Sequence, residues 1–434
     1  MERIKVAIRI RPFLPNENED NTGINMNPDD DNTIMITNNL KTFKGVFDRI
    51  LSIDSTQKDV FDFIKPCLTK IKNSNNCTIL TYGQTGSGKT YTIFGGDWSF
   101  NDNSSSEKSK KEKDEYNLII NKQLVIDPLS ESNGIIPNLI MELFNIYNKK
   151  NNEGSKEDEK NEDEIKKEDN NLNITCCYIQ IYNEKIYDLL QYPQEINNKK
   201  DFEVISNRNK SEVLINQNCL KIKSDKKKGI ILDGVNEIKT NSFYDLFDIL
   251  TLGETNRKIR RTNENDMSSR SHTIFIIDIE DKISKIKSKI KLCDVAGSER
   301  FDSSQKYNKE HIFEMRSINK SLFVLGNIIN ILASKNKIHK YIPYKDSKLT
   351  RILEDSLSGN SCIYLIATIS PKDEDFNETI NTLKFADRAH EVMVSIAPNE
   401  IISEEFGQGN NNKLYKELSE LKQQIFNFII SRYF

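Results

Sequence analysis

Apolar side chains stand at every second position from Ile4 to Ile10, and the residues between them are polar or small. This period of two predicts a half-buried β-strand that ends before Pro12. Five further compact apolar runs are typical of strands, and they fall at 76–82, 173–182, 272–280, 289–295 and 362–370. Strands are therefore predicted along most of the chain.

Helical periodicity separates several of these strands. Apolar residues spaced three to four apart from Ile318 to Leu332 predict a helix that buries one face. Further helices are predicted within 46–71, at 243–252 and from Asn377 through the 380s. Strands that alternate with helices predict an α/β fold, in which helices cover both faces of a central sheet.

Two polar segments interrupt this pattern. Residues 97–132 are rich in Ser, Lys and Asn, and residues 149–170 are rich in Asn, Glu and Lys with one apolar residue, Ile165. Neither segment can bury enough apolar surface to offset the entropy lost when its backbone is ordered. We expect both to be disordered insertions on the surface.

Composition narrows the class of protein. Hydrophobic residues make up 36% of the chain, enough for a substantial core, and the net charge of −3 indicates no particular partner. The seven cysteines include no C-x-x-C pair and no histidine at metal spacing, which favours reduced thiols over disulfides or a zinc site. No apolar run approaches the roughly 20 residues that cross a bilayer, and no leader peptide is evident. We expect a soluble intracellular protein with no membrane contact.

The segment from Gly83 to Thr90 fits the pattern G-x-x-x-x-G-K-[ST] and lies between a predicted strand and a predicted helix. Its glycines let the backbone curl so that successive N–H groups face phosphate oxygens. In such a loop Lys89 reaches the β- and γ-phosphates, and the Thr90 hydroxyl binds Mg²⁺. A chance glycine-rich turn is the alternative, but the strand–loop–helix context favours nucleotide binding.

Two later motifs supply the remaining parts of a triphosphate site. Asp294 ends an apolar strand, where it can hold Mg²⁺ through water, and Gly297 can offer its N–H to a γ-phosphate. The hydroxyl-rich segment 265–272 can meet metal and phosphate, and Arg270 can pair with a carboxylate such as Glu299. Each motif alone could be an ordinary polar turn. All three in this order make that interpretation improbable.

From about residue 3 to 400 the chain resembles kinesin motor domains. The matching stretches are 9–12, 46–61, 81–92, 134–137, 182–190, 265–272, 294–300, 318–322 and 341–353. Myosins also combine a P-loop with two switch segments, but the sequences of these segments differ from those of this chain. The resemblance implies a P-loop NTPase fold, with a mostly parallel central sheet of about eight strands flanked by helices on both faces.

The resemblance also implies how the chain binds ATP and Mg²⁺. Arg9, Arg11 and Pro12 would lie against the adenine, and Tyr91 would stack on it. The phosphates would be held by Gly83, Gln84, Thr85, Gly86, Ser87, Gly88, Lys89 and Thr90. Metal contacts would come from Thr90, Ser269 and, through water, Asp294.

Hydrolysis would depend on two switch segments, as in the family, and here these are residues 265–272 and 294–300. Arg270 and Glu299 would form a salt bridge that closes the two switches, and Gly297 would sense the γ-phosphate. The attacking water would be ordered by Asn265 and Ser268, and catalysis would proceed by positioning and electrostatics, without a covalent intermediate.

A basic segment points to the partner. Residues 316–351 hold one acid, Asp346, and eight bases, a net charge of +7 that suits a polyanionic surface. A solvated helix face is the ordinary interpretation of such a run, and nucleic acid is a rival ligand, although no interleaved aromatic platform or recognition helix is evident. In kinesins this stretch faces the microtubule. The expected contacts are Lys320, Lys335, Lys337, Lys340, Lys345, Lys348 and Arg351.

We expect a motor domain at 1–393, a neck linker at 394–405 and a short tail at 406–434. Ile396 would be the apolar docking residue of the linker and Asn399 its latch. Leu414 to Phe428 step four and three residues apart, which fits either an isolated amphipathic helix or the start of a coiled coil that makes a homodimer. Because only Met1 and Glu2 precede Arg3, the strand that pairs with a docked linker is expected to be very short, and force generation weak.

Some features depart from the family pattern. The segment from Phe301 to Phe313 lacks the glycine typical of the loop after the second switch, so microtubule activation is expected to be unusual. Glu314 stands where the family has an acidic residue. The stretches 253–254, 273–275 and 321–326 look most like the centromere-associated (CENP-E-like) branch.

The sequence thus predicts a microtubule-stimulated ATPase of the cytoplasm and cytoskeleton, with the mitotic spindle as one location. It is expected to be plus-end-directed, because the linker follows the core. Three alternatives stay open: a microtubule depolymerase, a nucleotide-dependent binding protein with negligible turnover, and a small G-protein-like switch. The last is disfavoured, since no N-K-x-D motif is present.

Overall fold

The computed structural model describes residues 1–17, 24–26, 32–37, 42–96, 98–102, 122–126, 130–153, 172–191, 219–225, 229–240, 243–261, 270–281, 285–299, 309–334 and 341–399. Residues Met1–Asn399 form one compact unit. The tail at 406–434, with its predicted amphipathic helix, lies outside the described residues. No helix in the described ranges is long and apolar enough to cross a membrane.

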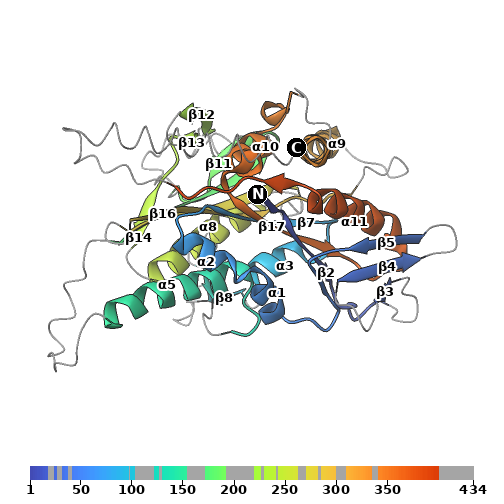
Figure 1. Ribbon diagram of the computed structural model, residues 1–434, viewed down its shortest axis with the longest axis horizontal. Coiled ribbons are helices and arrows are strands. Elements are labelled where there is room, and N and C mark those ends of the chain that lie inside the picture. The colour runs from blue at the N-terminus through green and yellow to red at the C-terminus, as the bar shows by residue number, and fades with distance from the viewer. Residues whose placement is uncertain are drawn as a thin grey trace, which may run out of the picture. The chain divides into compact units, whose positions relative to one another are not determined.

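A nine-stranded sheet forms the centre of this unit (Figure 1). Half of it is parallel, in the order β16 (Ile286–Asp294), β7 (Cys77–Tyr82), β17 (Cys362–Ile369), β2 (Lys5–Ile10) and β6 (Arg49–Leu51). Every residue of β17 is buried, as expected for a strand covered on both faces. The predicted strands are therefore confirmed in this half.

The other half of the sheet is antiparallel. β15 (His272–Asp281) pairs with β16, β10 (Leu172–Tyr182) pairs with β15, and β11 (Lys185–Asp188) and β14 (Ile238–Thr240) both pair with β10. The sheet is thus mixed, not mostly parallel as expected. Because β15 runs opposite to β16, the start of β15 meets the ends of β16 and β7 at one edge of the sheet.

One face of the sheet is covered by α1 (Gln57–Ile64), α2 (Cys67–Lys72), α3 (Lys89–Phe94), α5 (Ile135–Glu153) and α8 (Phe243–Arg261) (Figure 1). Their apolar residues form one buried cluster with the residues of the strands that face them. The helix predicted within 46–71 is therefore two helices. This division agrees with a proline between them, which cannot donate the next helical hydrogen bond.

The opposite face is covered by α9 (Lys309–Ala333), α10 (Lys348–Ile352) and α11 (Phe376–His390) (Figure 1). A second buried cluster joins these helices to the sheet. Short helical turns flank them, namely η2 (Tyr344–Asp346), η3 (Ser356–Asn360) and η4 (Asp373–Asp375). The predicted layer of helices on each face is confirmed.

The prediction that 97–132 and 149–170 lack regular structure is wrong for part of each. Within the first, β8 (Trp98–Asp102) and β9 (Lys122–Ile126) pair antiparallel, and α5 extends to Glu153 in the second. The polar average of the first segment concealed two short runs that contain apolar residues. The rest of both segments lies outside the described residues.

Small sheets lie at the margins of the unit. β3 (Ile24–Met26), β4 (Thr33–Thr37) and β5 (Thr42–Val46) make one, and β12 (Lys221–Asp225) and β13 (Gly229–Asp233) make another. Asp355 accepts a hydrogen bond from the Ile230 N–H, which ties β13 to the segment after α10.

The two ends of the unit meet in a two-residue ladder. β1 (Glu2–Arg3) pairs antiparallel with β18 (Met393–Val394), so the very short N-terminal strand does pair with the segment that follows α11. The Asn399 N–H donates to the Ser74 carbonyl at 2.7 Å, and Asn399 Nδ2 donates to Asn76 Oδ1 at 2.8 Å. The segment from 393 to 399 is therefore fastened to the core at both of its ends.

Candidate nucleotide and switch site

The P-loop connects β7 to α3, as the sequence predicts. Gly83 must be glycine, because a Cβ there would lie 2.2 Å from the Thr368 carbonyl oxygen. Gly88 precedes α3 with φ +97°, a left-handed conformation that favours glycine. The loop therefore adopts a conformation that only its glycines make accessible.

Lys89 is buried inside this loop. Its Nζ donates to the Gly83 carbonyl at 3.0 Å and to the Gln84 carbonyl at 2.8 Å. Burial lowers the pKa of Lys89, and the charges of Asp294 and Glu299 oppose that shift. In the described part of the chain no carboxylate forms an ion pair with Lys89, and a buried cation without one fits an anionic ligand.

The predicted metal residues Thr90 and Asp294 lie side by side. Thr90 Oγ1 donates to Asp294 Oδ2 at 2.8 Å, and Thr81 Oγ1 donates to Asp294 Oδ1 at 3.2 Å. Hydroxyl and carboxylate oxygens are ligands that Mg²⁺ accepts, so this pair fits the ion. The third predicted metal residue, Ser269, lies outside the described residues, as do Asn265 and Ser268.

A buried arginine that was not predicted from the sequence lies behind Asp294. Arg257 Nη2 pairs with Glu254 Oε2 at 2.9 Å, and Arg257 Nη1 lies 3.6 Å from Asp294 Oδ2. The Tyr178 hydroxyl donates to the same glutamate. Burial alone lowers the pKa of Arg257, but Glu254, Tyr178 and Asp294 outweigh burial and the pKa is raised. The available signal was an opposite-charge pair three residues apart, just after the helix predicted at 243–252; α8 in fact continues through both residues.

The predicted salt bridge between Arg270 and Glu299 is not present. Arg270 Nη1 instead pairs with Glu314 of α9 at 2.8 Å, and the Tyr182 hydroxyl donates to the same carboxylate. Glu299 accepts hydrogen bonds from Thr85 N at 2.8 Å and from Thr85 Oγ1 at 2.6 Å. The prediction is wrong for this conformation, because each residue satisfies its charge or hydrogen-bonding capacity elsewhere.

Gly297 lies directly against this contact. A Cβ at Gly297 would be 2.3 Å from Thr85 Oγ1 and 2.2 Å from Glu299 Oε2. The glycine, the P-loop threonine and the carboxylate therefore meet at one point, next to the phosphate-binding loop.

His272 joins both switch segments to α9, a role that was not predicted from the sequence. The Ala296 N–H donates to His272 Nδ1 at 3.0 Å, so the proton of the neutral ring is on Nε2, which lies 2.7 Å from Ser321 Oγ. Burial, aided by the Lys89 charge, lowers the pKa of His272 to about 3. The ring is neutral at physiological pH and holds three segments in register.

The predicted adenine residues are only partly brought together. The Arg9 guanidinium lies 5.2 Å from the centre of the Tyr91 ring and donates to Gln57 and Thr92. Burial lowers the pKa of Arg9 to about 10. Tyr91 remains 45% exposed, which leaves its ring accessible for stacking.

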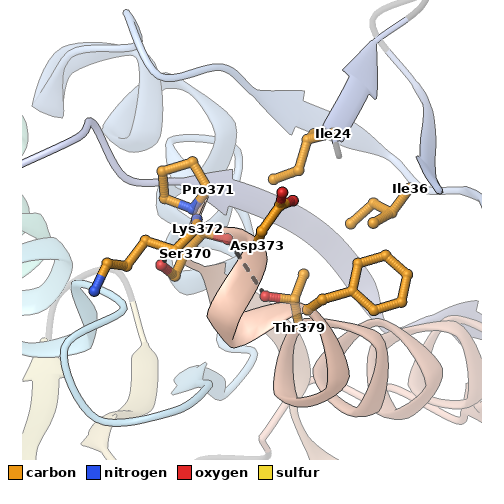
Figure 2. A pocket seen from close by; sticks show the side chains of 8 residues that line it. Ile24, Ile36, Ser370, Pro371, Lys372, Asp373 and Thr379 are labelled. Carbon is orange, nitrogen blue, oxygen red and sulfur yellow. Dashed lines mark hydrogen bonds between the residues drawn. The ribbon is translucent and has the colours of Figure 1, made fainter. Parts of the chain in front are cut away.

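Arg11 differs from the prediction, because its guanidinium makes two hydrogen bonds with Glu17, at 2.6 and 2.7 Å. These bonds hold the pKa of Glu17 at about 2. Figure 2 shows a hollow lined by side chains of β3, β4 and residues 370–379. Two lining residues contact this pair, because Arg11 donates to Ser370 and Lys372 lies 3.5 Å from Glu17. The hollow contains no P-loop residue and has room for about one water molecule, so it is not the nucleotide site.

Comparison with known proteins agrees with this geometry. The family model "Kinesin motor domain" matches residues 9–392. The chain belongs to the kinesin motor domain family.

Several kinesins resemble it closely. Chromosome-associated kinesin KIF4 of Xenopus laevis is 32% identical over 90% of the chain and 27% of its own length. Kinesin-related protein 5 of Dictyostelium discoideum is 35% identical over 96% of the chain and 36% of its own length. The chain thus spans about a third of these relatives. The centromere-associated branch stays a prediction.

Solved kinesin structures share the fold. A structure of a fast kinesin superposes with a TM-score of 0.68 at 29% identity, over 94% of this chain and 97% of that one. The motor domain of the Kar3-like kinesin from Ashbya gossypii gives a TM-score of 0.62 at 27% identity, over 89% of this chain and 99% of that one.

In this kinesin the basic segment is only partly free. Lys320, Lys345 and Lys348 are exposed. Arg351, a predicted microtubule contact, is already engaged within the chain, because its guanidinium bonds to Glu354 and to Ser224 of β12. The remaining predicted contacts, Lys335, Lys337 and Lys340, lie outside the described residues.

Proposed function

We propose that the chain is the motor domain of a microtubule-dependent ATPase, in which ATP hydrolysis controls binding to and movement along microtubules. One observation carries the proposal: Arg270 joins the segment before β15, a strand that begins beside Asp294 at the end of β16, directly to α9, the helix that carries exposed basic residues. A change in the nucleotide pocket that moves Arg270 therefore acts on the helix that would face the track.

The substrate would be ATP. The backbone of the P-loop and Lys89 would hold its phosphates, with Arg9 and Tyr91 at the adenine. Thr90 and Ser269 would hold Mg²⁺ directly and Asp294 would hold it through water, and the ion would neutralise charge on the transferred phosphoryl group. Asn265 and Ser268 would order the attacking water.

Binding of ATP would then transfer Arg270 from Glu314 to Glu299. A γ-phosphate beside Thr85 and Gly297 would repel Glu299 from its present position, because both groups are negative. Glu299 would be free to take Arg270 from Glu314. The salt bridge expected from the family would thus form only when ATP is bound, and its formation would release α9 from the Arg270 side chain.

A neck linker at 394–405 would follow a motor domain at 1–393, and residues 394–399 would be its first part. Its contacts support this role, because β18 pairs with β1, Ile396 packs against the core and Asn399 is hydrogen-bonded to Asn76. We propose plus-end-directed movement on this basis. The tail would pair two copies of the chain.

The partner would be the microtubule, since the exposed lysines of α9 and the η2–α10 region suit an acidic surface. The chain would then act in the cytoplasm, on the cytoskeleton and the mitotic spindle.

The deciding experiment is co-sedimentation of the chain with stabilised microtubules, with ADP and with a non-hydrolysable ATP analogue, together with ATPase rates with and without microtubules. We expect tighter binding with the analogue and faster turnover with microtubules. Binding that ignores the nucleotide, or the absence of turnover, would contradict the proposal. Shortening of microtubules without gliding would identify a depolymerase instead.

A further inference from the structure

The exposed stripe of α9 has an unusual composition. Arg316, Lys320, Phe323 and Asn330 are exposed, and their spacing of four, three and seven residues places them on one side of the helix. The opposite side is buried and apolar, including Leu322 and its neighbours in the helix. Phe323 thus stands in the middle of a polar and basic stripe, with 68% of its surface exposed.

A second aromatic residue lies in the same basic segment. Tyr341, which precedes η2, is 74% exposed. Phe323 and Tyr341 are the two most exposed aromatic side chains of the described residues, ahead of Tyr91. Single exposed apolar residues are common on protein surfaces, but both of these fall within the stretch 316–351, whose net charge is +7.

We infer that Phe323 and Tyr341 are apolar anchors for the microtubule, which insert into its acidic surface between the contacts made by the lysines. The inference rests on the proposed function and adds to it a contact that salt does not screen. Interfaces concentrate their binding energy in a few aromatic and arginine side chains, while charged residues at the rim govern the rate of association and its salt dependence.

Basic residues surround both aromatic side chains, which favours the acidic surface of the microtubule as the partner. Lys320 lies three residues before Phe323 on the same face, and Lys345 and Lys348 follow Tyr341 and are exposed. A partner that buries the aromatic side chains must therefore be acidic around them. Single-stranded nucleic acid also stacks on aromatic residues, but it requires a row of them along a groove, and the described part of this segment offers two exposed ones that are not on the same element.

The test compares substitutions in the full chain by their effect on microtubule affinity at low and high KCl. F323S removes the apolar ring, K320A removes a charge on the same face, and M35S removes an exposed apolar side chain of β4. Thermal unfolding of each variant checks that the fold is intact.

We expect F323S and Y341S each to raise the Kd about tenfold at both salt concentrations, which corresponds to about 1.4 kcal/mol. K320A should raise the Kd at low salt and have a smaller effect at high salt, because screening already weakens that contact. M35S should bind like the unsubstituted chain.

Two results would overturn the inference alone: F323S and Y341S that bind within about twofold of the unsubstituted chain, or an aromatic-dependent affinity for a single-stranded oligonucleotide that displaces microtubules. An unsubstituted chain that fails to sediment with microtubules would overturn the proposed function, and the inference with it.

Discussion

Arg270 of the segment before β15 and Glu314 of α9 form an ion pair with an N–O distance of 2.8 Å, and both side chains are largely shielded from water. The Tyr182 hydroxyl donates to the same carboxylate. Glu314 therefore holds Arg270 in this conformation, and Glu299 can pair with Arg270 only if the bond to Glu314 breaks. Under the proposed mechanism, the energy of the pair between Arg270 and Glu314 would set how readily the two switches close.

Glu314→Gln should accelerate ATP hydrolysis in the absence of microtubules. The neutral amide keeps the shape of the side chain but weakens its hold on Arg270, so the pair with Glu299 forms more readily. We expect a single-turnover rate about three to ten times higher, as the loss of a partly buried ion pair implies. Glu354→Gln, which alters the Arg351 pair, is the matched control and should leave the rate unchanged. A slower rate in Glu314→Gln would show that the pair supports catalysis.

Glu299→Gln should separate binding from turnover. Removing the negative charge next to Thr85 relieves repulsion of the γ-phosphate, so ATP should bind about three to ten times more tightly. The same change removes the partner that Arg270 needs for closure, and kcat should fall by about 100-fold. Stopped-flow binding of a fluorescent ATP analogue and steady-state turnover measure the two effects. Parallel losses in affinity and turnover would contradict this assignment.

The local parts of the site were predictable from the sequence, because their geometry depends on residues close in the chain. The glycines of the P-loop and Lys89 act within eight residues. Pairing of β16 with β7 sets Asp294 opposite Thr81, and the P-loop that follows β7 brings Thr90 beside Asp294. The P-loop and Asp294 meet at one edge of the sheet because each follows or ends one of two neighbouring parallel strands.

Partner choice among long charged side chains was not predictable in the same way. The sequence offers both Glu299 and Glu314 as partners for Arg270, and only the tertiary packing selects Glu314. Arg11 likewise bonds to Glu17, six residues away in a loop, and Arg351 bonds to Ser224 across two elements. The network around Arg257 was missed, because burial of a charge is not visible in a helix pattern.

Replacing the buried arginine should destabilise the fold severely. Arg257→Met leaves the buried Glu254 carboxylate without its cation, and we expect the free energy of unfolding to fall by about 3–5 kcal/mol. Adding Glu254→Gln should recover part of this loss, since the uncompensated charge is removed. Urea unfolding measures both. Lys223→Met breaks an exposed ion pair with Asp233 and should cost less than about 1 kcal/mol.

His272 should make stability depend on pH in the acidic range. Its pKa is about 3 in the folded chain and roughly 6.5 when unfolded, so between these values the unfolded chain binds a proton that the folded chain does not. Stability is fully present above about pH 6.5 and falls as the pH is lowered, by up to about 1.4 kcal/mol per pH unit. Urea unfolding at pH 7, 6 and 5 measures this slope. His272→Gln should reduce it, and equal slopes would contradict the assignment.

Asn399 and the P-loop lie at opposite ends of the same strand. Asn399 bonds to Asn76, the residue before β7, and Gly83 follows the last residue of β7. A six-residue strand is about 20 Å long and hardly stretches, so it acts as a ruler between the two places. The strand therefore fixes the distance between the P-loop and the C-terminal segment, and local stretching of β7 cannot link the two places.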